Sequence, residues 1–268
     1  MSAPAILLLG FGNMGQALVN GWLAPAYGAR TITVVDPHPA AQAAARERGL
    51  RVSTGESAGE ADVVVVAVKP AQLREALRAI PPGVRSRAVF VSIVAGKTTA
   101  ELAKSLGDDA AVVRAMPNTP AAIGQGVTAL FARPNVSDVQ RRISGDLMAA
   151  VGRVEWIEDE ALMDVVTALS GSGPAYVFLL IECLTEAGRE LGLSPDLAAR
   201  LATETVAGAG AYARHSGQPA DELRRRVTSP KGTTQAALEV LQSEHGLEQL
   251  IRRAVRAAAK RSRELSRE

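Results

Sequence analysis

The stretch ILLLGFGNMGQAL, residues 6–18, decides the fold of this 268-residue chain. Its apolar start predicts a strand covered on both faces, and the residues after it predict the start of a helix. Between them, Gly10, Gly12 and Gly15 have the spacing G-x-G-x-x-G. In this setting the first glycine allows a tight turn, the second lets the backbone approach a pyrophosphate, and the third lets helix and strand pack closely. The pattern alone also fits a structural turn, but its strand and helix context favours a dinucleotide site.

A carboxylate at the end of the next expected strand, Thr31–Val35, bears on which dinucleotide binds. Asp36 is placed to accept hydrogen bonds from the ribose 2′-hydroxyl of NAD, and it would repel the 2′-phosphate of NADP. No arginine follows directly, although Arg46 or Arg48 on the next expected helix remains an alternative partner for a phosphate. We therefore expect NADPH or NADH as the cofactor, with Asp36 favouring NADH.

Short apolar runs alternate with stretches of helical composition through the first half of the chain. After the first two strands they occupy Val63–Val68, Ala88–Ile93 and Ala111–Ala115, and the runs GVTALF and VEWI extend the series. Because these runs are apolar on both faces and alternate with helices, they predict a parallel, doubly wound sheet. We expect an α/β fold in which residues 1–158 form a Rossmann-type dinucleotide-binding domain.

Three further segments follow expected strands at the edge where doubly wound sheets bind ligands. They are AVKP (67–70), SIVAG (92–96) and MPNTP (116–120). Lys69 is either a cation that faces phosphate or a helix-entry residue in water, and Asn118 lies in a stiff loop suited to a planar ring or carboxamide. The expected cofactor residues are therefore Gly10, Phe11, Gly12, Asn13, Met14, Gly15, Asp36, Ala67, Lys69, Pro70, Ala95, Gly96 and Asn118.

The second part of the chain has a different composition. From residue 159 to 268 it is rich in Ala, Leu, Glu and Arg, and helix-start signals at Gly173–Pro174 and Ser194–Asp196 are among those that predict roughly five or six helices. We expect an all-α C-terminal domain over residues 159–268. Because such a short, alanine-rich domain is poorly able to bury all its apolar faces alone, we also expect it to self-associate.

Composition and charge argue against several other classes of protein. The chain is 47% hydrophobic and 22% charged, and 30 basic against 28 acidic side chains leave a net charge of +2. This balance is typical of a soluble protein and gives no reason to expect a nucleic-acid partner. The basic C-terminal segment is expected to be a solvated amphipathic helix, with nucleic-acid binding as its alternative.

A membrane span, a disulfide, a reactive thiol and a metal site are not expected either. The N-terminus lacks a basic region, and the apolar run Ala175–Ile181 is too short to cross a bilayer, so we expect a cytoplasmic protein. The single cysteine, Cys183, has no partner for an internal disulfide, and its apolar neighbours predict a buried, unreactive thiol. The three histidines lie outside the motifs described here, and we expect no metal.

The stretch VTSPKGTTQAAL, residues 227–238, concentrates small hydrogen-bonding residues at an expected helix start. One interpretation is an ordinary N-cap, because Ser and Thr satisfy free backbone N–H groups there. The other is an anion site, because the same N–H groups and hydroxyls bind a carboxylate. The residues of this stretch leave both interpretations open.

Taken together, the motifs resemble those of pyrroline-5-carboxylate reductases. The shared segments are GFGNMG, AVKP, MPNTPAAIGQGVTAL, LSGSGPAYVFLLIE and VTSPKGTTQAAL, in the order and spacing of that family. The resemblance covers nearly the whole chain. It implies reduction of the cyclic imine 1-pyrroline-5-carboxylate to proline by NADPH or NADH, and a homodimer formed through the helical domain, with a decamer of five dimers as a further possibility.

The resemblance also implies roles for individual residues in a substrate site. Thr234 would be the catalytic residue, with a hydrogen bond to the ring nitrogen. Ser229 and the amides of Gly232 and Thr233 would hold the carboxylate, and Ser172 and Gly173 would form the other wall. Because a protonated imine is already an electrophile, such a site depends on positioning more than on a histidine base.

One residue departs from the pattern of the family, which usually has S-P-G-G-T-T where this chain has S-P-K-G-T-T. Lys231 therefore predicts that the backbone here does not need a conformation reserved for glycine. We expect its side chain to point into solvent, with direct contact to substrate as the alternative.

Three other functions compete with imine reduction. A 3-hydroxyacid dehydrogenase on a similar plan needs a lysine on the long helix, where this chain has Val177. A non-catalytic dinucleotide binder would be expected to lack the serine and threonine groups that are present here. A reductase of a six-membered cyclic imine remains open, because one methylene changes binding by only about 1–3 kcal/mol.

Overall fold

The computed structural model describes residues 3–23, 27–53 and 60–266. Its contacts divide the chain into two compact units: unit 1 comprises residues 1–171 and 258–268, and unit 2 comprises residues 172–257. Unit 1 thus extends beyond residue 158, because Met163 and Ala168 are fully buried in it and Ser262, near the end of the chain, donates to Asp164.

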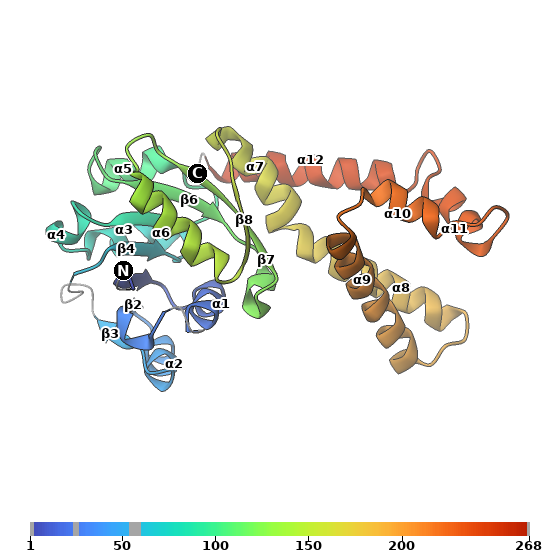
Figure 1. Cartoon of the computed structure of the whole chain (residues 1–268), viewed down its shortest axis with the longest axis horizontal. Helices are drawn as coiled ribbons and strands as arrows, with labels where there is room; N and C mark the ends of the chain where they lie inside the picture. The colour runs from blue at the N-terminus through green and yellow to red at the C-terminus, as the bar shows by residue number, and fades with distance from the viewer. Residues whose placement is uncertain (1–2, 24–26, 54–59, 267–268) are drawn as a thin grey trace. The chain divides into compact units, whose positions relative to one another are not determined.

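Unit 1 consists of a sheet with helices on both faces (Figure 1). Its strands are β1 (Ile6–Leu9), β2 (Ile32–Val35), β3 (Arg51–Ser53), β4 (Val63–Val66), β5 (Val89–Ser92), β6 (Val112–Met116), β7 (Gly126–Ala132) and β8 (Gly152–Trp156). Its α-helices include α1 (Asn13–Trp22), α2 (Pro39–Glu47), α3 (Leu73–Arg78), α4 (Pro82–Arg85), α5 (Thr99–Leu106), α6 (Asp138–Ala149) and α7 (Met163–Val166). Short 3₁₀ turns are η1 (Ala29–Thr31), η2 (Pro70–Gln72), η3 (Thr119–Ile123) and η4 (Glu160–Leu162), and η5 (Thr167–Gly171) is a π-helical turn.

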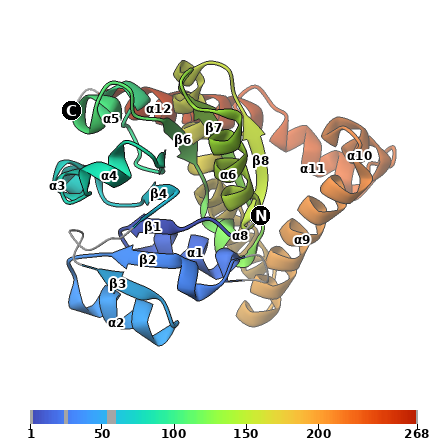
Figure 2. The ribbon, with the colours of Figure 1, turned by 60° about the vertical axis from the view of Figure 1, so that its left-hand side comes forward.

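The strand order is β3-β2-β1-β4-β5-β6-β7-β8, and its first half can be followed in Figure 2. The expected strands are all present, and the sheet is parallel from β3 to β6. β7 departs from the expected parallel direction because the short η3 turn connects it to β6, which allows only antiparallel pairing. Parallel pairing resumes between β7 and β8, which α6 connects. A capping box of Ser137 and Gln140 begins α6.

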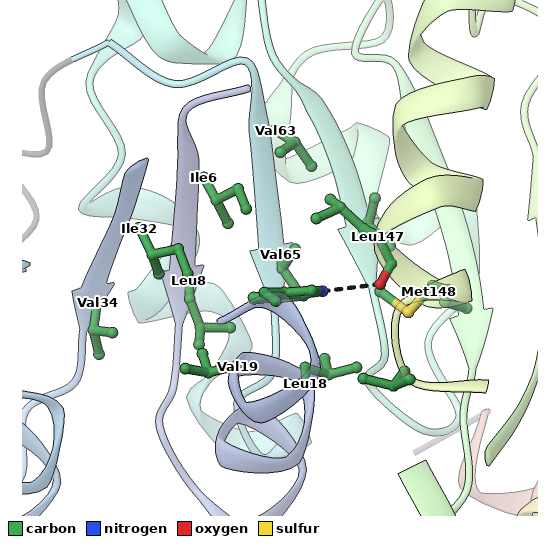
Figure 3. Packing of buried hydrophobic residues seen from close by; sticks show 14 of the residues in the cluster. Ile6, Leu8, Leu18, Val19, Ile32, Val34, Val63, Val65, Leu147 and Met148 are labelled. Carbon is green, nitrogen blue, oxygen red and sulfur yellow. Dashed lines mark hydrogen bonds between the residues drawn. The ribbon is translucent and has the colours of Figure 1, made fainter. Parts of the chain in front are cut away.

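Alternate strand residues supply two hydrophobic cores, one on each face of the sheet. Ile6 and Leu8 of β1 pack with α1 and α6 in one core, and Leu7 and Leu9 pack with α3 and α5 in the other. Figure 3 shows the first core, in which residues of β1, β2 and β4 meet Leu18 and Val19 of α1 and Leu147 and Met148 of α6. The indole N–H of Trp22 donates to the carbonyl of Leu147 at 2.9 Å, so the core also has a buried polar anchor.

Unit 2 is helical, as expected. Its helices are α8 (Gly173–Glu190), α9 (Pro195–Ser216), α10 (Ala220–Arg226), α11 (Thr233–Leu241) and α12 (Leu247–Leu265), the last of which ends in unit 1. None of the residues of α8, α10 or α11 is buried, and α9 buries only Ala198 and Ala202. Cys183 is exposed, so the expectation of a buried thiol is wrong: α8 is apolar, but this chain does not provide a core for it.

The same helical region has the composition of a membrane span. Within the described residues, Glu160–Glu190 is long and apolar enough to cross a membrane, with a mean hydropathy of 1.4 over its most apolar window. That stretch is longer than the apolar run on which the sequence expectation rests. Only 6% of the window is buried inside the chain, so its apolar side chains are available to an outside partner.

Candidate functional site

A cleft of about 550 Å³ opens at the carboxyl edge of β1, β2 and β4 in unit 1. This is the edge at which open α/β sheets bind ligands. Of the residues expected at the cofactor site, the cleft is lined by Gly10, Gly12, Asp36, Ala67 and Lys69. The structure therefore brings the glycine-rich turn, the strand-end carboxylate and the AVKP segment together around one cavity.

The three glycines have different steric surroundings. Gly10 has φ +92°, and a Cβ there would lie 2.6 Å from the carbonyl oxygen of Ala67. A Cβ on Gly15 would lie 2.5 Å from the carbonyl oxygen of Gly10, so this glycine allows α1 to approach the turn. A Cβ on Gly12 would meet nothing within 4 Å. The protein itself does not require glycine at position 12, and the open space there fits the close approach of a pyrophosphate.

The N-terminus of α1 is suited to an anion. Gly12 is its N-cap residue, no side chain caps the helix, and its first turn contains no acidic residue. No protein side chain therefore caps the first amides of the helix, and these amides and the helix dipole are available to an anion. These features fit the phosphates of a dinucleotide.

The carboxylate of Asp36 is hydrogen-bonded to the glycine-rich turn. Its Oδ2 accepts the N–H of Phe11 at 2.8 Å, and its Oδ1 accepts the N–H of His38 at 2.9 Å. The residue is 8% exposed, yet it lines the cleft. Asp36 thus shapes the turn and also presents its carboxylate to the cleft. The amide of Phe11 donates to this carboxylate, and the ring of Phe11 lies in the core.

The alternative cations do not line the cleft. Arg48 donates to Gln16 at 2.9 Å and to Asn20 at 3.2 Å, and its guanidinium lies 5.3 Å from the ring centre of Phe11. Arg46 donates to Gln42 on its own helix. Among the lysines and arginines that the structure describes, only Lys69 lines the cleft, and it is exposed there. The arrangement favours Lys69 over Arg46 and Arg48 as a partner for phosphate.

The remaining expected cofactor residues have other positions. Asn13, Met14 and Gly15 form the first turn of α1, and Pro70 begins η2. Ala95 and Gly96 follow β5 at the same edge of the sheet, but they do not line the cleft. Gly96 has φ +72°, and a Cβ there would lie 3.2 Å from the backbone of Leu265. The end of α12 therefore packs against the loop after β5.

The helix that follows this loop begins with a capping box. Glu101 accepts the N–H and the hydroxyl of Thr98, and it pairs with Lys97 at 3.4 Å. Burial raises the pKa of Glu101, but the hydrogen bonds from Thr98 and the charge of Lys97 outweigh it, and the pKa lies below its ordinary value. The carboxylate therefore stays ionised and holds the start of α5 in place.

The side chain of Asn118 makes its hydrogen bonds within the protein. It is buried after β6, where its Oδ1 accepts the N–H of Val127 at 3.0 Å and its Nδ2 donates to the carbonyl of Ser170 at 3.1 Å. It does not line the cleft. Both ends of its amide thus bind the protein backbone.

The hydroxyl-rich stretch in unit 2 does not serve as an N-cap. Gly232 is the N-cap residue of α11, and no side chain caps the helix. Thr228 instead donates to the carbonyl of Arg224 at the end of α10. The side chains of Ser229, Thr233 and Thr234 are exposed at the helix start, so the N-cap interpretation is wrong. These hydroxyls are free of a capping role and suit a ligand with a carboxylate.

The backbone amides at the start of α11 differ in whether they already donate a hydrogen bond within the protein. The N–H of Gly232 donates to the carbonyl of Ser229 at 3.0 Å and closes a turn. The amides of the first turn of α11 begin at Thr233, and this turn contains no acidic residue. A carboxylate at this site therefore has the Thr233 amide and the hydroxyls as its donors, with the Gly232 amide already engaged.

The two other expected substrate residues begin α8. Ser172 is its N-cap residue with no side-chain cap, and a Cβ on Gly173 would meet nothing within 4 Å. They follow the π-helical turn η5 directly, and π-helical turns inside helices are frequent at functional sites.

The backbone conformation of Lys231 contradicts the expectation that this position needs no conformation favoured by glycine. Its φ is +60°, and it has the only positive φ outside glycine among the described residues. Its N–H donates to Oε1 of Gln235 at 2.7 Å, which holds the residue in this conformation. The turn thus retains the left-handed backbone for which the family pattern uses glycine. The side chain is exposed, as expected.

Replacing Lys231 by glycine should therefore stabilise the fold. The left-handed conformation costs a residue with a Cβ about 1–2 kcal/mol, which glycine avoids. Glycine also gains conformational freedom in the unfolded chain, and this offsets part of the stabilisation. We expect a net gain of about 0.5 kcal/mol in thermal or urea unfolding. Lys231→Ala, which removes the same side chain but keeps the Cβ, should bring no gain. Equal stability of the two variants would contradict this account of the turn.

Sequence reasoning missed several residues that line the cleft: His38, Gln42, Ser53, Gln72, Glu75, Ala76 and Ala79. His38 lies three residues beyond the end of β2, at the ligand-binding edge, and this position in the sequence could have indicated it. The others come from helix faces and from β3, whose placement depends on tertiary packing. Among the described residues, no group of three or more His, Cys, Asp or Glu side chains is arranged to hold a metal.

Comparison with known proteins identifies relatives along the whole chain. Residues 160–265 match the family model for pyrroline-5-carboxylate reductase dimerisation, and residues 5–96 match that for coenzyme F420-dependent NADP oxidoreductases. Pyrroline-5-carboxylate reductase of Pseudomonas aeruginosa is 44% identical over 269 residues, which cover 99% of this chain and 98% of the relative.

Solved structures agree with these matches. A pyrroline-5-carboxylate reductase from Coxiella burnetii has a TM-score of 0.93 and 37% identity, with 99% of each chain covered. Pyrroline carboxylate reductase of Plasmodium falciparum, solved with NADP bound, has a TM-score of 0.87 and 30% identity, again with 99% of each chain covered.

Proposed function

Because the chain belongs to the pyrroline-5-carboxylate reductase family, we propose that it reduces 1-pyrroline-5-carboxylate to L-proline, the last step of proline biosynthesis. It is an oxidoreductase, and its cofactor is a nicotinamide dinucleotide. The observation that carries the proposal is the start of α11, where three exposed hydroxyls are gathered at a helix N-terminus that they do not cap.

The substrate is a five-membered ring with a carboxylate and a C=N bond. Its carboxylate suits the hydroxyl of Ser229 together with the amide and hydroxyl of Thr233, at the positive end of the α11 dipole. The hydroxyl of Thr234 suits the ring nitrogen, so we assign Thr234 as the catalytic residue. Ser172 and Gly173, at the start of α8, are assigned to the second wall.

Little acid–base chemistry is required of these residues. When bound, the reduced dinucleotide supplies the hydride that the imine carbon accepts. The task of the protein is to hold the ring in a fixed orientation and to stabilise the changing charge at its nitrogen. Threonine and serine hydroxyls serve both purposes without a titrating group.

The proposed cofactor residues divide by function. The phosphates are assigned to the turn from Gly10 to Gly15 and to Lys69, and the adenosine ribose to Asp36. The carboxylate of Asp36 would lie near a 2′-phosphate and repel it, and neither Arg46 nor Arg48 lines the cleft. We therefore propose a preference for NADH over NADPH.

A second copy of the chain is the proposed partner of unit 2. The matching family model is named for dimerisation, and the helices of unit 2 leave large apolar residues exposed, including Phe178 and Leu201. A homodimer would cover these faces and explain why Glu160–Glu190 is apolar without crossing a membrane. The larger assembly that we propose is a decamer of five such dimers. The proposed location is the cytoplasm.

Steady-state kinetics test the choice of substrate and cofactor. We expect kcat/KM to be higher with NADH than with NADPH, and higher with the five-membered imine than with its six-membered analogue. The expected ring preference is about 10-fold to 200-fold, because one methylene changes transition-state binding by about 1–3 kcal/mol. A preference for NADPH would contradict the role of Asp36, and a preference for the larger ring would contradict the assigned substrate.

A further inference from the structure

We propose that Asn118 is a positioning residue for substrate, which holds the backbone just before Ser172 and Gly173, and that it is not a ligand of the cofactor. The inference rests on the proposed function of the start of α8. It assigns a task to a motif, MPNTP, whose loop does not line the cofactor cleft.

The side chain of Asn118 is committed to two backbone groups that lie far apart in the sequence. Its oxygen accepts the N–H of Val127, at the start of β7, and its nitrogen donates to the carbonyl of Ser170, in the π-helical turn. A backbone N–H pairs only with the amide oxygen, and a carbonyl only with the amide nitrogen. These partners therefore fix the orientation of the side chain. Asn118 is also 8% exposed, so little of it faces a ligand.

The chain itself leaves the carbonyl of Ser170 in need of a donor. In an α-helix this carbonyl would accept the N–H of residue 174, but residue 174 is proline and has none. The next amide, that of Ala175, donates to the carbonyl of Ser172 at 3.0 Å. Asn118 thus supplies the bond that Pro174 removes.

A second contact joins the same two segments. A Cβ on Gly171 would lie 2.6 Å from Cε at the flexible end of the Met116 side chain, so the π-helical turn packs closely against this side chain at the end of β6. Met116 and Asn118 flank Pro117, and together they hold Ser170 and Gly171. Ser172 and Gly173 follow without a break. Displacing this backbone by about 1 Å would misplace substrate groups enough to slow the reaction about a hundredfold.

The test separates positioning of substrate from binding of cofactor. Asn118→Asp keeps an oxygen for Val127 but places a second oxygen against the carbonyl of Ser170. Asn118→Ala removes both bonds without this repulsion, and it serves if the aspartate variant does not fold. Asn135→Asp is the matched control, because Nδ2 of Asn135 also donates to backbone carbonyls, those of Asp109 and Ala110, remote from the assigned site residues.

Each variant is assayed for its NADH dissociation constant without substrate, for kcat and KM with the imine, and for its melting temperature. For Asn118→Asp we expect an unchanged NADH dissociation constant and a fall in kcat/KM for the imine of about 10-fold to 100-fold. For Asn135→Asp we expect unchanged imine kinetics, whatever the loss of melting temperature.

Two results would overturn the inference. A large rise in the NADH dissociation constant of Asn118→Asp would make the residue a cofactor ligand. A lower melting temperature with unchanged imine kinetics in both Asn118 variants would make it a purely structural residue. If the wild-type protein does not reduce the imine, the proposed function fails and the substrate role fails with it. The NADH measurement still tests the claim that Asn118 does not bind the cofactor.

Discussion

Replacing Thr234 by alanine should lower kcat/KM for the imine about a hundredfold, with a small effect on NADH binding. The hydroxyl is exposed in the first turn of α11 and does not cap the helix, so it is free to stabilise the changing charge at the ring nitrogen. Removing one such preorganised donor costs enzymes about 100-fold to 1,000-fold in rate. Steady-state kinetics with the imine at saturating NADH measure the effect.

Two variants control for other causes. Thr234→Ser keeps the hydroxyl and should retain most of the activity. Thr228→Ala removes a hydroxyl six residues earlier, which donates to the carbonyl of Arg224, and should leave the imine kinetics nearly unchanged. If Thr234→Ala were as active as Thr234→Ser, Thr234 would not be the catalytic residue.

Replacing Gly12 by alanine should weaken NADH binding at least about a hundredfold without lowering the melting temperature. The new methyl group meets no protein atom within 4 Å, so the fold tolerates it. It occupies the space in which the backbone would approach the pyrophosphate, and lost phosphate contacts of about 3 kcal/mol correspond to this factor. Titration of NADH fluorescence and thermal unfolding measure the two effects separately.

Alanine substitutions at two other glycines serve as controls for Gly12→Ala. Gly15→Ala places a Cβ 2.5 Å from the carbonyl oxygen of Gly10 and should destabilise the fold by about 1–3 kcal/mol. Gly83→Ala, in α4, also adds a methyl group to open space but should leave NADH binding intact. Unchanged NADH binding in Gly12→Ala would show that the dinucleotide does not approach this turn.

The cofactor half of the fold is predictable because its signals are local. Apolar strands and the spacing of Gly10, Gly12 and Gly15 determine the turn, and Asp36 follows from the end of β2. β3 is only three residues long, too short to show a period. The direction of β7 depends on the short connection after β6, which an apolar pattern does not reveal.

Three other residues have surroundings that their residue type does not reveal. Asparagine in a stiff loop suggests hydrogen bonding, but the partner of Asn118 at Ser170 lies 52 residues away. Lysine predicts an ordinary backbone at position 231, but the side chain of Gln235 stabilises the left-handed one. Hydropathy predicts a buried Cys183, although the single chain leaves α8 uncovered. For Asn118 and Cys183 the deciding factor is a tertiary contact or its absence, whereas at Lys231 a side chain four residues away stabilises a backbone that lysine disfavours.

The central claim is that this chain transfers hydride to a cyclic imine. The most direct measurement is NADH oxidation by the purified wild-type protein with 1-pyrroline-5-carboxylate, together with quantification of proline. The account predicts that one proline forms for each NADH oxidised. Folded protein that binds NADH but forms no proline with either NADH or NADPH would contradict it.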